Sequence, residues 1–364
     1  MKTRSISFLL VIIFSGLFSC VPAKTAKVKT NKEIRNVILM IGDGMGLATL
    51  YSAMTVSPQP LNIERCPETG LAKTFASDNY ITDSAAAGTA LATGNKTKNG
   101  VIGMDAQGNR VKSILEIAES HGLSTGMVST SSITHATPAS FVAHQSSRGS
   151  YEDIAKDLMV TGIDVFIGGG YDHFAKRKDK LNLIDTLTKR GYDVETSMES
   201  ILNSGSLKIA GLTAPVHNPY RLKGRGDMLP NASGKAIDVL SKNKKGFFLM
   251  IEGSQIDWAG HANSADTLVD ETLDFDKTIG RVLDFAQKDG HTLVIITADH
   301  ETGGVTLVDG NLETHKVKIA FSKTDHTAVC VPVFAFGPGA EKFTGIYNNT
   351  DIFSKIMAAY GFQQ

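Results

Sequence analysis

Three continuous apolar runs of strand length constrain the fold of this chain more than any other feature. They cover residues 37–41, 246–251 and 292–296. None of them alternates between apolar and polar residues, which is typical of strands buried on both faces of a parallel sheet. Strands are also predicted at 124–130, 164–167 and 331–336, with helical segments between them. The pattern predicts an α/β fold with a large, mostly parallel central β-sheet and helices on both faces.

A carboxylate follows each of the three runs: Asp43, Glu252 and Asp299, the last with His300 beside it. Open α/β sheets bind their ligands at the carboxyl ends of the strands. Acidic groups that converge there repel one another, and burial adds to the cost of their charge, unless cations lie among them. Carboxylates with imidazole suit zinc, and an all-oxygen set suits magnesium. A single carboxylate of this kind is equally consistent with a simple turn.

A helix is predicted to begin at Ser84, because Asp83 can cap it and the alanine-rich segment 85–92 favours helix. The first turn of a helix presents free N–H groups and attracts anions. Ser84 is therefore a candidate nucleophile for a phosphate ester, although a serine at a helix start is more often only a cap.

A second set of possible metal ligands is spread over the C-terminal half. Asp257 and His261 are four residues apart, so a helix would place both on one face. His326, in a polar loop before the last strand, would complete an Asp, His, His set. Taken alone, the Asp257–His261 pair is also consistent with an ordinary surface contact.

Other segments carry less information. Residues 111–120 predict a helix, a further helix is expected to start near residue 139, and residues 171–231 are interpreted as an exposed helix and a surface excursion. The three glycines at 168–170 lack the surroundings of a dinucleotide site or a P-loop. The net charge is +0, which excludes a broad nucleic-acid-binding surface.

The N-terminus resembles an export signal. Lys2 and Arg4 precede an apolar run at 6–18, which is short for a membrane span and typical of a signal-peptide core. The ending before Cys20 resembles a bacterial lipoprotein cleavage site, although cleavage elsewhere would release a free protein. We expect an exported protein, periplasmic or associated with the outer membrane, anchored through a lipid on Cys20.

The expected organisation is a signal peptide at 1–20, a flexible tether at 21–33 and a single catalytic domain at 34–364. Export permits a disulfide between Cys66 and Cys330, but two cysteines far apart in sequence do not establish one.

Six motifs together resemble the alkaline phosphatase family, in that family's order and across nearly the whole mature chain. They are IGDGMG at 41–46, TDSAA at 82–86, THATP at 134–138, EGSQID at 252–257, TADHETGG at 297–304 and HTA at 326–328. The resemblance implies the family's three-layer sandwich and its activity, the hydrolysis of phosphate monoesters to an alcohol and inorganic phosphate.

Carried over residue by residue, the resemblance implies two zinc sites and one magnesium site. The first zinc would be held by Asp257, His261 and His326, the second by Asp43, Asp299 and His300 with Ser84 nearby, and the magnesium by Asp43, Thr137 and Glu252. The resemblance also implies that Ser84 forms a phosphoserine intermediate at this two-zinc plus magnesium site. Arg148 matches the arginine whose fork holds the phosphate.

This chain departs from the family pattern in three respects. His135 stands where some members have an aspartate near the third metal, and Trp258 stands where others have a lysine or histidine near phosphate. Both affect the expected third-site metal and the affinity for phosphate. The short segment between Glu301 and His326 predicts that the family's crown insert is reduced to a short ribbon, which favours an open site and broad substrate use. The resemblance implies a homodimer.

Three alternatives differ from this interpretation in identifiable residues. A sulfatase would carry a Cys/Ser-x-Pro-x-Arg motif where Ser84 is followed by alanines. A phosphoglycerate mutase or phosphodiesterase relative would share the metal ligands but would not be expected to match Arg148 or the THATP motif. A lipoprotein that captures metal or phosphate without turnover would not need Ser84.

Overall fold

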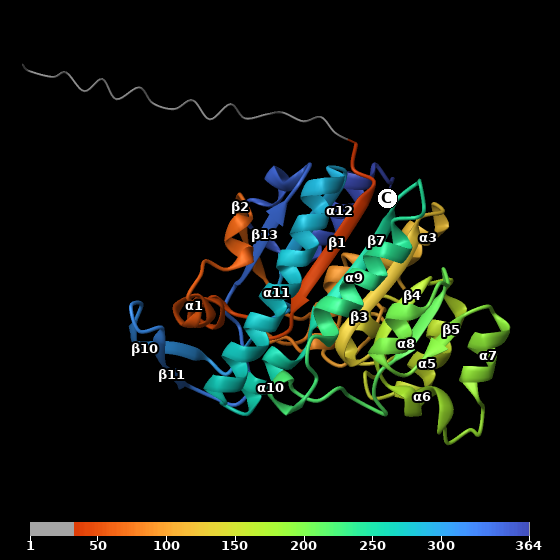
Figure 1. Cartoon of the computed structure of the whole chain (residues 1–364), viewed down its shortest axis with the longest axis horizontal. Helices are drawn as coiled ribbons and strands as arrows, with labels where there is room; N and C mark the ends of the chain where they lie inside the picture. The colour runs from red at the N-terminus through yellow and green to blue at the C-terminus, as the bar shows by residue number, and fades with distance from the viewer. Residues whose placement is uncertain (1–32, 364) are drawn as a thin grey trace, which may run out of the picture. The chain divides into compact units, whose positions relative to one another are not determined.

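A ten-stranded sheet runs through the part of the chain that the computed structural model describes, residues 33–363 (Figure 1). Its strand order is β14-β2-β13-β8-β1-β7-β3-β4-β6-β5. β13 pairs antiparallel with both neighbours, and the other pairs of this sheet are parallel. The prediction of a large, mostly parallel sheet is confirmed. The strands are β1 (Asn36–Gly42), β2 (Glu68–Lys73), β3 (Ser124–Ser132), β4 (Val165–Gly169), β5 (Asp193–Glu195), β6 (Ile209–Leu212), β7 (Phe247–Gly253), β8 (Thr292–Thr297), β13 (Val331–Phe336) and β14 (Gly345–Asn348).

The centre of the sheet contains the apolar runs that the sequence singled out. β8, β1 and β7 are neighbours, and every residue of the three strands is buried. Each fully buried aliphatic side chain contributes roughly 1.5–3 kcal/mol relative to exposure, so these strands anchor the core. The same burial on both faces explains why their sequences do not alternate.

Helices cover the sheet in two groups (Figure 1). In the first group, α9 and α11 pack on each other, α9 packs against β3 and α11 packs against β8. In the second group, α2, α3 and α12 pack together, and α3 packs against β3 and β7. The helices are α1 (Leu47–Val56), α2 (Ser84–Thr93), α3 (Ile114–Ser120), α4 (Ala136–Ala139), α5 (Tyr151–Val160), α6 (Tyr171–Ala175), α7 (Leu183–Lys189), α8 (Met198–Asn203), α9 (Met228–Leu240), α10 (Gln255–His261), α11 (Ala265–Asp289) and α12 (Thr350–Tyr360).

A two-stranded ribbon takes the place expected for the crown. β10 (Val305–Asn311) and β11 (Lys316–Phe321) pair antiparallel and project at one side of Figure 1. The prediction of a reduced crown agrees with this hairpin. Next to it, β9 (Glu301–Thr302) pairs with β12 (His326–Thr327).

Three local predictions were wrong or incomplete. The helix predicted at 111–120 is α3, which begins only at Ile114 because Ser113 and Glu116 form a capping box there. The helix expected to start near residue 139 is absent: α4 ends at Ala139. The region interpreted as a surface excursion instead adds β6 and β5 to the sheet, and the four residues of β6 are buried.

Some expectations concern residues outside the described part. The predicted signal peptide, Cys20 and nearly all of the tether lie there. Contacts group residues 33–363 in one unit. Within residues 33–363, Cys66 and Cys330 are both free thiols, and no helix is long and apolar enough to cross a bilayer.

Candidate active site

The carboxylates that follow the three apolar strands lie together at one edge of the sheet. Ile41 of β1 is paired with Glu252 on one side and with Thr297 on the other. This register places Asp43, Glu252 and Asp299 at the carboxyl ends of neighbouring strands, and each is at most 1% exposed. The convergence predicted from the sequence is confirmed.

A first ligand group joins α10 to the short strand β12. Asp257 and His261 lie on one face of α10, with His261 Nε2 3.3 Å from Asp257 Oδ2. His326 Nε2 lies 3.2 Å from His261 Nε2 and 3.5 Å from Asp257 Oδ1. The Nδ1 atoms of the two histidines each lie 2.8 Å from a backbone carbonyl, that of Thr324 and that of Thr82. With their Nδ1–H groups donated there, both rings would direct an Nε2 lone pair to one point once a bound cation displaces the Nε2 protons.

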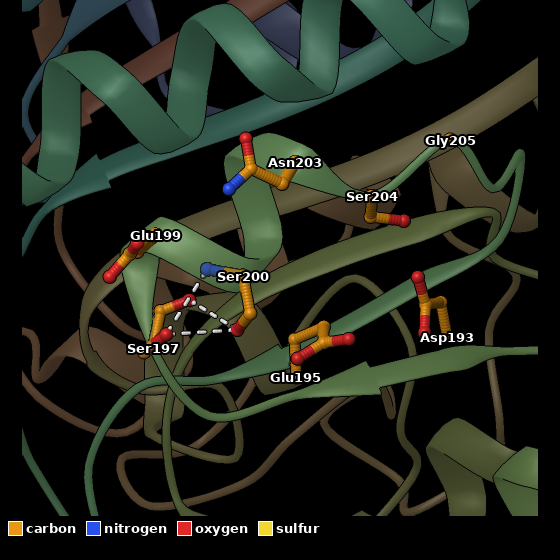
Figure 2. Close-up of a pocket in the computed structure, with 8 residues that line it drawn as sticks. All are labelled: Asp193, Glu195, Ser197, Glu199, Ser200, Asn203, Ser204 and Gly205. Carbon is orange, nitrogen blue, oxygen red and sulfur yellow. Dashed lines mark hydrogen bonds between the residues drawn. The ribbon is translucent and has the colours of Figure 1, made fainter.

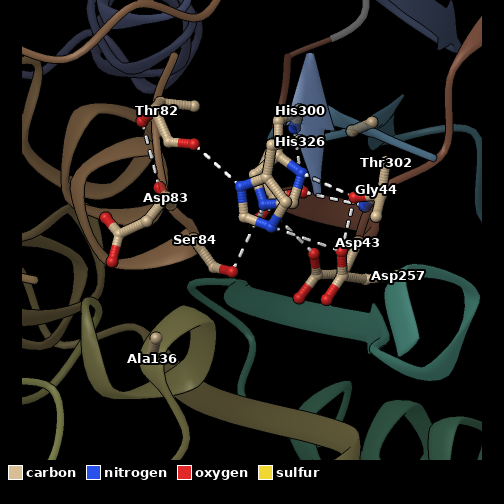
Figure 3. A network of polar contacts seen from close by, with 12 residues as sticks. Asp43, Gly44, Thr82, Asp83, Ser84, Ala136, Asp257, His300, Thr302 and His326 are labelled. Carbon is tan, nitrogen blue, oxygen red and sulfur yellow. Dashed lines mark hydrogen bonds and ion pairs between the residues drawn. The ribbon is translucent and has the colours of Figure 1, made fainter. Parts of the chain in front are cut away.

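A second group surrounds the predicted nucleophile (Figure 3). His300 Nε2 lies 3.2 Å from Asp299 Oδ2, 3.5 Å from Asp43 Oδ1 and 3.3 Å from Ser84 Oγ. The ring of His300 also stacks on that of His326, with centroids 3.5 Å apart. The first and second groups are therefore adjacent, and Ser84 lies beside the second.

A third group contains Asp43, His135 and Glu252, whose ligand atoms lie within 4.8 Å of one another. Both carboxylate oxygens of Asp43, Oε1 of Glu252 and Oγ1 of Thr137 are buried without a hydrogen-bond partner. Buried polar atoms are normally paired, and unpaired buried charge is costly. A bound cation would satisfy these oxygens, so the residues present fit a metal ion here.

The acidity of the cluster supports the same conclusion. Burial, followed by the charge of Asp299, raises the pKa of Asp43 well above its usual value. Burial and the charge of Asp257 raise the pKa of Asp299 to about 7. Burial acts in the same direction on Asp257, but hydrogen bonds from His261 and His326 outweigh it and hold its pKa well below the usual value. Without cations, the strand-end carboxylates thus resist carrying their full charge.

The start of α2 fixes both Ser84 and Arg148. Asp83 caps the helix through Oδ1, which accepts from the backbone N–H of Ala86 at 2.9 Å. Its Oδ2 accepts from Arg148 Nη1 at 2.9 Å and from the Gly100 N–H at 3.0 Å. The predicted helix start is confirmed, and the same carboxylate orients the guanidinium next to the nucleophile.

His135 and Trp258 lie side by side at the third group. Their rings meet edge to face with centroids 5.8 Å apart, and His135 Nε2 lies 3.4 Å from Arg148 Nη2. Burial and then the Arg148 charge lower the pKa of His135 to about 3, so the ring is neutral at ordinary pH. His217, to which the sequence assigned no role, packs on Trp258 with centroids 4.8 Å apart.

Gly44, in the predicted IGDGMG motif, lets two ligand groups approach closely. Its φ is +75°, and a Cβ there would lie 2.7 Å from the Asp257 Cα and 2.9 Å from Thr302 Oγ1. A larger residue would therefore separate β1 from α10. Sequence analysis gave Thr302 no role, because nothing in its spacing distinguishes it from a loop threonine.

A separate hollow of about 520 Å³ lies next to β5 and α8 (Figure 2). It carries three carboxylates, those of Asp193, Glu195 and Glu199. Within the described residues, these carboxylates are not among the groups whose oxygens come close enough to share an ion. The chemistry is therefore concentrated at the strand ends.

The chain matches known proteins over most of its length. Residues 34–318 match the family model for alkaline phosphatase. Alkaline phosphatase 4 of Bacillus subtilis is 38% identical, over 95% of this chain and 93% of that protein, and the alkaline phosphatase of Escherichia coli is 32% identical, over 91% and 87%.

Solved structures agree with these matches. The alkaline phosphatase of the Antarctic bacterium TAB5 has a TM-score of 0.87 and 44% identity, covering 92% of this chain and all of its own. Two variants of that enzyme, in which a histidine is replaced by aspartate or glutamate, have Mg bound in a site called M3.

Proposed function

Because the chain belongs to the alkaline phosphatase family, we propose that it hydrolyses phosphate monoesters through a phosphoserine intermediate on Ser84. The observation that carries the proposal is the set of buried, unpaired oxygens on Asp43, Glu252 and Thr137. His300 Nε2 links this set to the nucleophile, since it lies 3.5 Å from Asp43 Oδ1 and 3.3 Å from Ser84 Oγ. A chain that only bound phosphate would not need a serine at this point.

Three cations would complete the site. Two zinc ions would be held by the two groups that combine carboxylate with imidazole, and one magnesium ion by the oxygen-rich third group. The ligands are Asp257, His261 and His326 for the first zinc, Asp43, Asp299 and His300 for the second, and Asp43, Thr137 and Glu252 for magnesium. When bound, these cations supply the positive charge that stabilises the deprotonated serine oxygen and the oxygen of the leaving alcohol.

In the first half-reaction, Ser84 Oγ gives its proton to solvent water and attacks phosphorus. The bond from phosphorus to Oγ forms as the bond to the ester oxygen breaks, and the leaving oxygen takes a proton from solvent to become the alcohol. Arg148, held by Asp83, pairs with two nonbridging oxygens and keeps the phosphoryl group in line. In the second half-reaction, water attacks phosphorus, the bond to Oγ breaks, and inorganic phosphate is released as Ser84 regains its proton.

The identity of the third cation depends on His135, whose ring lies within the same group as Asp43 and Glu252. The TAB5 variants that bind Mg in the M3 site carry an acidic residue in place of a histidine. This likeness supports a metal ion at the third site, and it supports His135 as a residue that lowers the affinity of that site for magnesium.

The decisive test is turnover of an aryl phosphate at alkaline pH, with and without chelator, beside Ser84→Ala. We expect metal-dependent release of phosphate and acid-stable phosphoprotein in the wild type, and neither in Ser84→Ala, which should still bind metal. Equal turnover by the variant would refute the phosphoserine mechanism. Metal and phosphate binding without turnover would instead establish a capture protein.

The remaining expectations are proposals of the same kind. We propose that the mature protein is exported, carries a lipid on Cys20 and forms a homodimer. Mass spectrometry of the membrane fraction tests the lipid, with Cys20→Ser as control, and light scattering of the soluble domain tests the dimer. A monomer in solution would overturn the dimer and leave the reaction unaffected.

A further inference from the structure

Three fully buried serine hydroxyls gather at the side of Glu252 that does not face the other ligands. Ser129 Oγ lies 2.6 Å from Glu252 Oε2, 2.8 Å from Ser131 Oγ and 2.9 Å from Ser254 Oγ. All three serines and Glu252 are 0% exposed. Glu252 Oε1, in contrast, has no hydrogen-bond partner. The two oxygens of this carboxylate are thus in different surroundings.

The sheet register creates this arrangement. Ser129 of β3 is paired with Glu252 of β7, so the two side chains lie next to each other on one face. Ser131 follows two residues later on the same strand, and the pairing of β3 with β4 is irregular between Val128 and Ser132. Ser254 follows the end of β7, and its backbone N–H donates to Thr130 Oγ1 at 2.9 Å. Serine hydroxyls from β3 and from the end of β7 therefore form one hydrogen-bonded network.

The direction of the hydrogen bonds follows from counting hydrogens. A hydroxyl has one hydrogen and can accept twice, and a carboxylate only accepts. Ser129 therefore donates to Glu252, at a distance typical of a hydrogen bond to a charged oxygen. Its two acceptances come from the Ser131 N–H at 3.1 Å and the Ser254 hydroxyl at 2.9 Å, since the Ser131 hydroxyl can donate to the Ser132 carbonyl at 3.2 Å. The donors consequently point toward Oε2 and leave Oε1 for another partner.

Buried hydroxyls are costly unless they are satisfied, and a satisfied network holds its members rigidly. Serines that merely satisfied one another would not need a carboxylate at their centre. Here the network ends on one oxygen of Glu252, while the other oxygen has no hydrogen-bond partner, and Glu252 belongs to the group of Asp43 and His135.

We propose that Ser129 is a positioning residue for the third metal site, and that it holds Glu252 with Oε1 directed at the cation. Ser131 and Ser254 orient the Ser129 hydroxyl. This inference rests on the proposed third site, because Glu252 would be its ligand. Hydrogen bonds to the ligands of a metal typically change its affinity by about 10–100-fold.

The test measures bound metal rather than activity. Purified wild type, Ser129→Ala and Ser254→Ala are dialysed at fixed free zinc against increasing magnesium, and both ions are counted per chain by mass spectrometry. Ser233→Ala is the matched control, since Ser233 is equally buried in α9 and its hydroxyl has no partner. Thermal unfolding of the metal-free proteins reports general damage.

We expect the apparent dissociation constant for magnesium to rise about 10–100-fold in Ser129→Ala and less in Ser254→Ala, with zinc content and metal-free stability close to those of Ser233→Ala. If Ser129→Ala does not fold, the same shift in Ser254→Ala carries the test. Magnesium binding within twofold of wild type in the folded variants would overturn the inference, as would equal loss of zinc and magnesium. Wild type that binds no third ion would refute the third site itself.

Discussion

The Thr302 hydroxyl lies 3.2 Å from Nδ1 of His300 and donates its own hydrogen to the carboxylate of Asp257. Because that hydrogen is already used, Thr302 can only accept from His300, which places the ring proton on Nδ1 and leaves Nε2 free. His300 and Asp257 belong to different ligand groups. One hydroxyl therefore orients ligands of both proposed zinc sites.

This relationship predicts the effect of Thr302→Val, which keeps the shape of the side chain and removes the hydroxyl. We expect zinc affinity to fall about 10–100-fold, because both ligands lose a fixed orientation. The zinc content of each protein after dialysis in metal buffers measures this change in affinity. Thr302→Ser retains the hydroxyl and should behave like wild type; a valine variant that also does so would contradict the role.

Asp83 should control how tightly phosphate is held, through Arg148. Asp83→Asn keeps a good helix cap but removes the charge that anchors the guanidinium. Inhibition by inorganic phosphate should then weaken, by roughly tenfold if the lost charged hydrogen bond is worth about 1.5 kcal/mol. Product-inhibition kinetics give the constant. An unchanged constant, with unchanged thermal stability, would show that Arg148 does not depend on Asp83.

His135→Asp tests the account of the third site. A neutral imidazole contributes no negative charge, whereas an aspartate adds a hard oxygen ligand that suits magnesium. Magnesium occupancy at limiting magnesium should therefore increase relative to wild type. Metal analysis of the two proteins, dialysed together, decides the matter, and equal occupancy would refute the role given to His135.

The metal-free protein should lose stability as the pH rises from about 4 to 7. The pKa of Asp299 is raised to about 7 from an ordinary value of 3.8, by burial and by the charge of Asp257. Between these values the folded protein binds a proton that the unfolded chain releases, so unfolding becomes easier with rising pH. Denaturation of chelator-treated protein measures this. Asp299→Asn cannot titrate and should show a shallower decline; parallel curves would contradict the assignment.

A buried ion pair should stabilise the segment that carries His217. Arg225 donates to Glu271 and Asp274 of α11, and all three side chains are nearly unexposed. Arg225→Met would leave the buried carboxylate of Glu271 without a cation and leave Asp274 only the more distant Arg221, so it should cost about 3–5 kcal/mol of stability. Lys277→Met breaks an exposed pair with Asp227 and should cost at most about 1 kcal/mol. Similar losses of unfolding free energy in the two variants, measured by denaturant titration, would contradict this prediction.

Local sequence patterns were sufficient to predict the elements that carry the candidate site. Runs without alternation identified β1, β7 and β8, and the residues that follow them proved to be buried together. A cap and an alanine-rich segment located Ser84 at the first turn of α2. Short strands with mixed composition, such as β5, were not predicted. Their own residues carry no strand pattern, and β5 is a strand because it pairs with β6.

The sequence by itself determined which residues are the candidates for the chemistry, since carboxylates, imidazoles and one serine stand at strand and helix ends in a specific order. Only the tertiary structure decided what orients them. Thr302, Ser129 and His217 act on residues far away in the chain, through one hydroxyl or one ring, and such contacts depend on strand order and register. A serine or threonine has the same local pattern whether its hydroxyl contacts a metal ligand or water, so no local rule distinguishes the two.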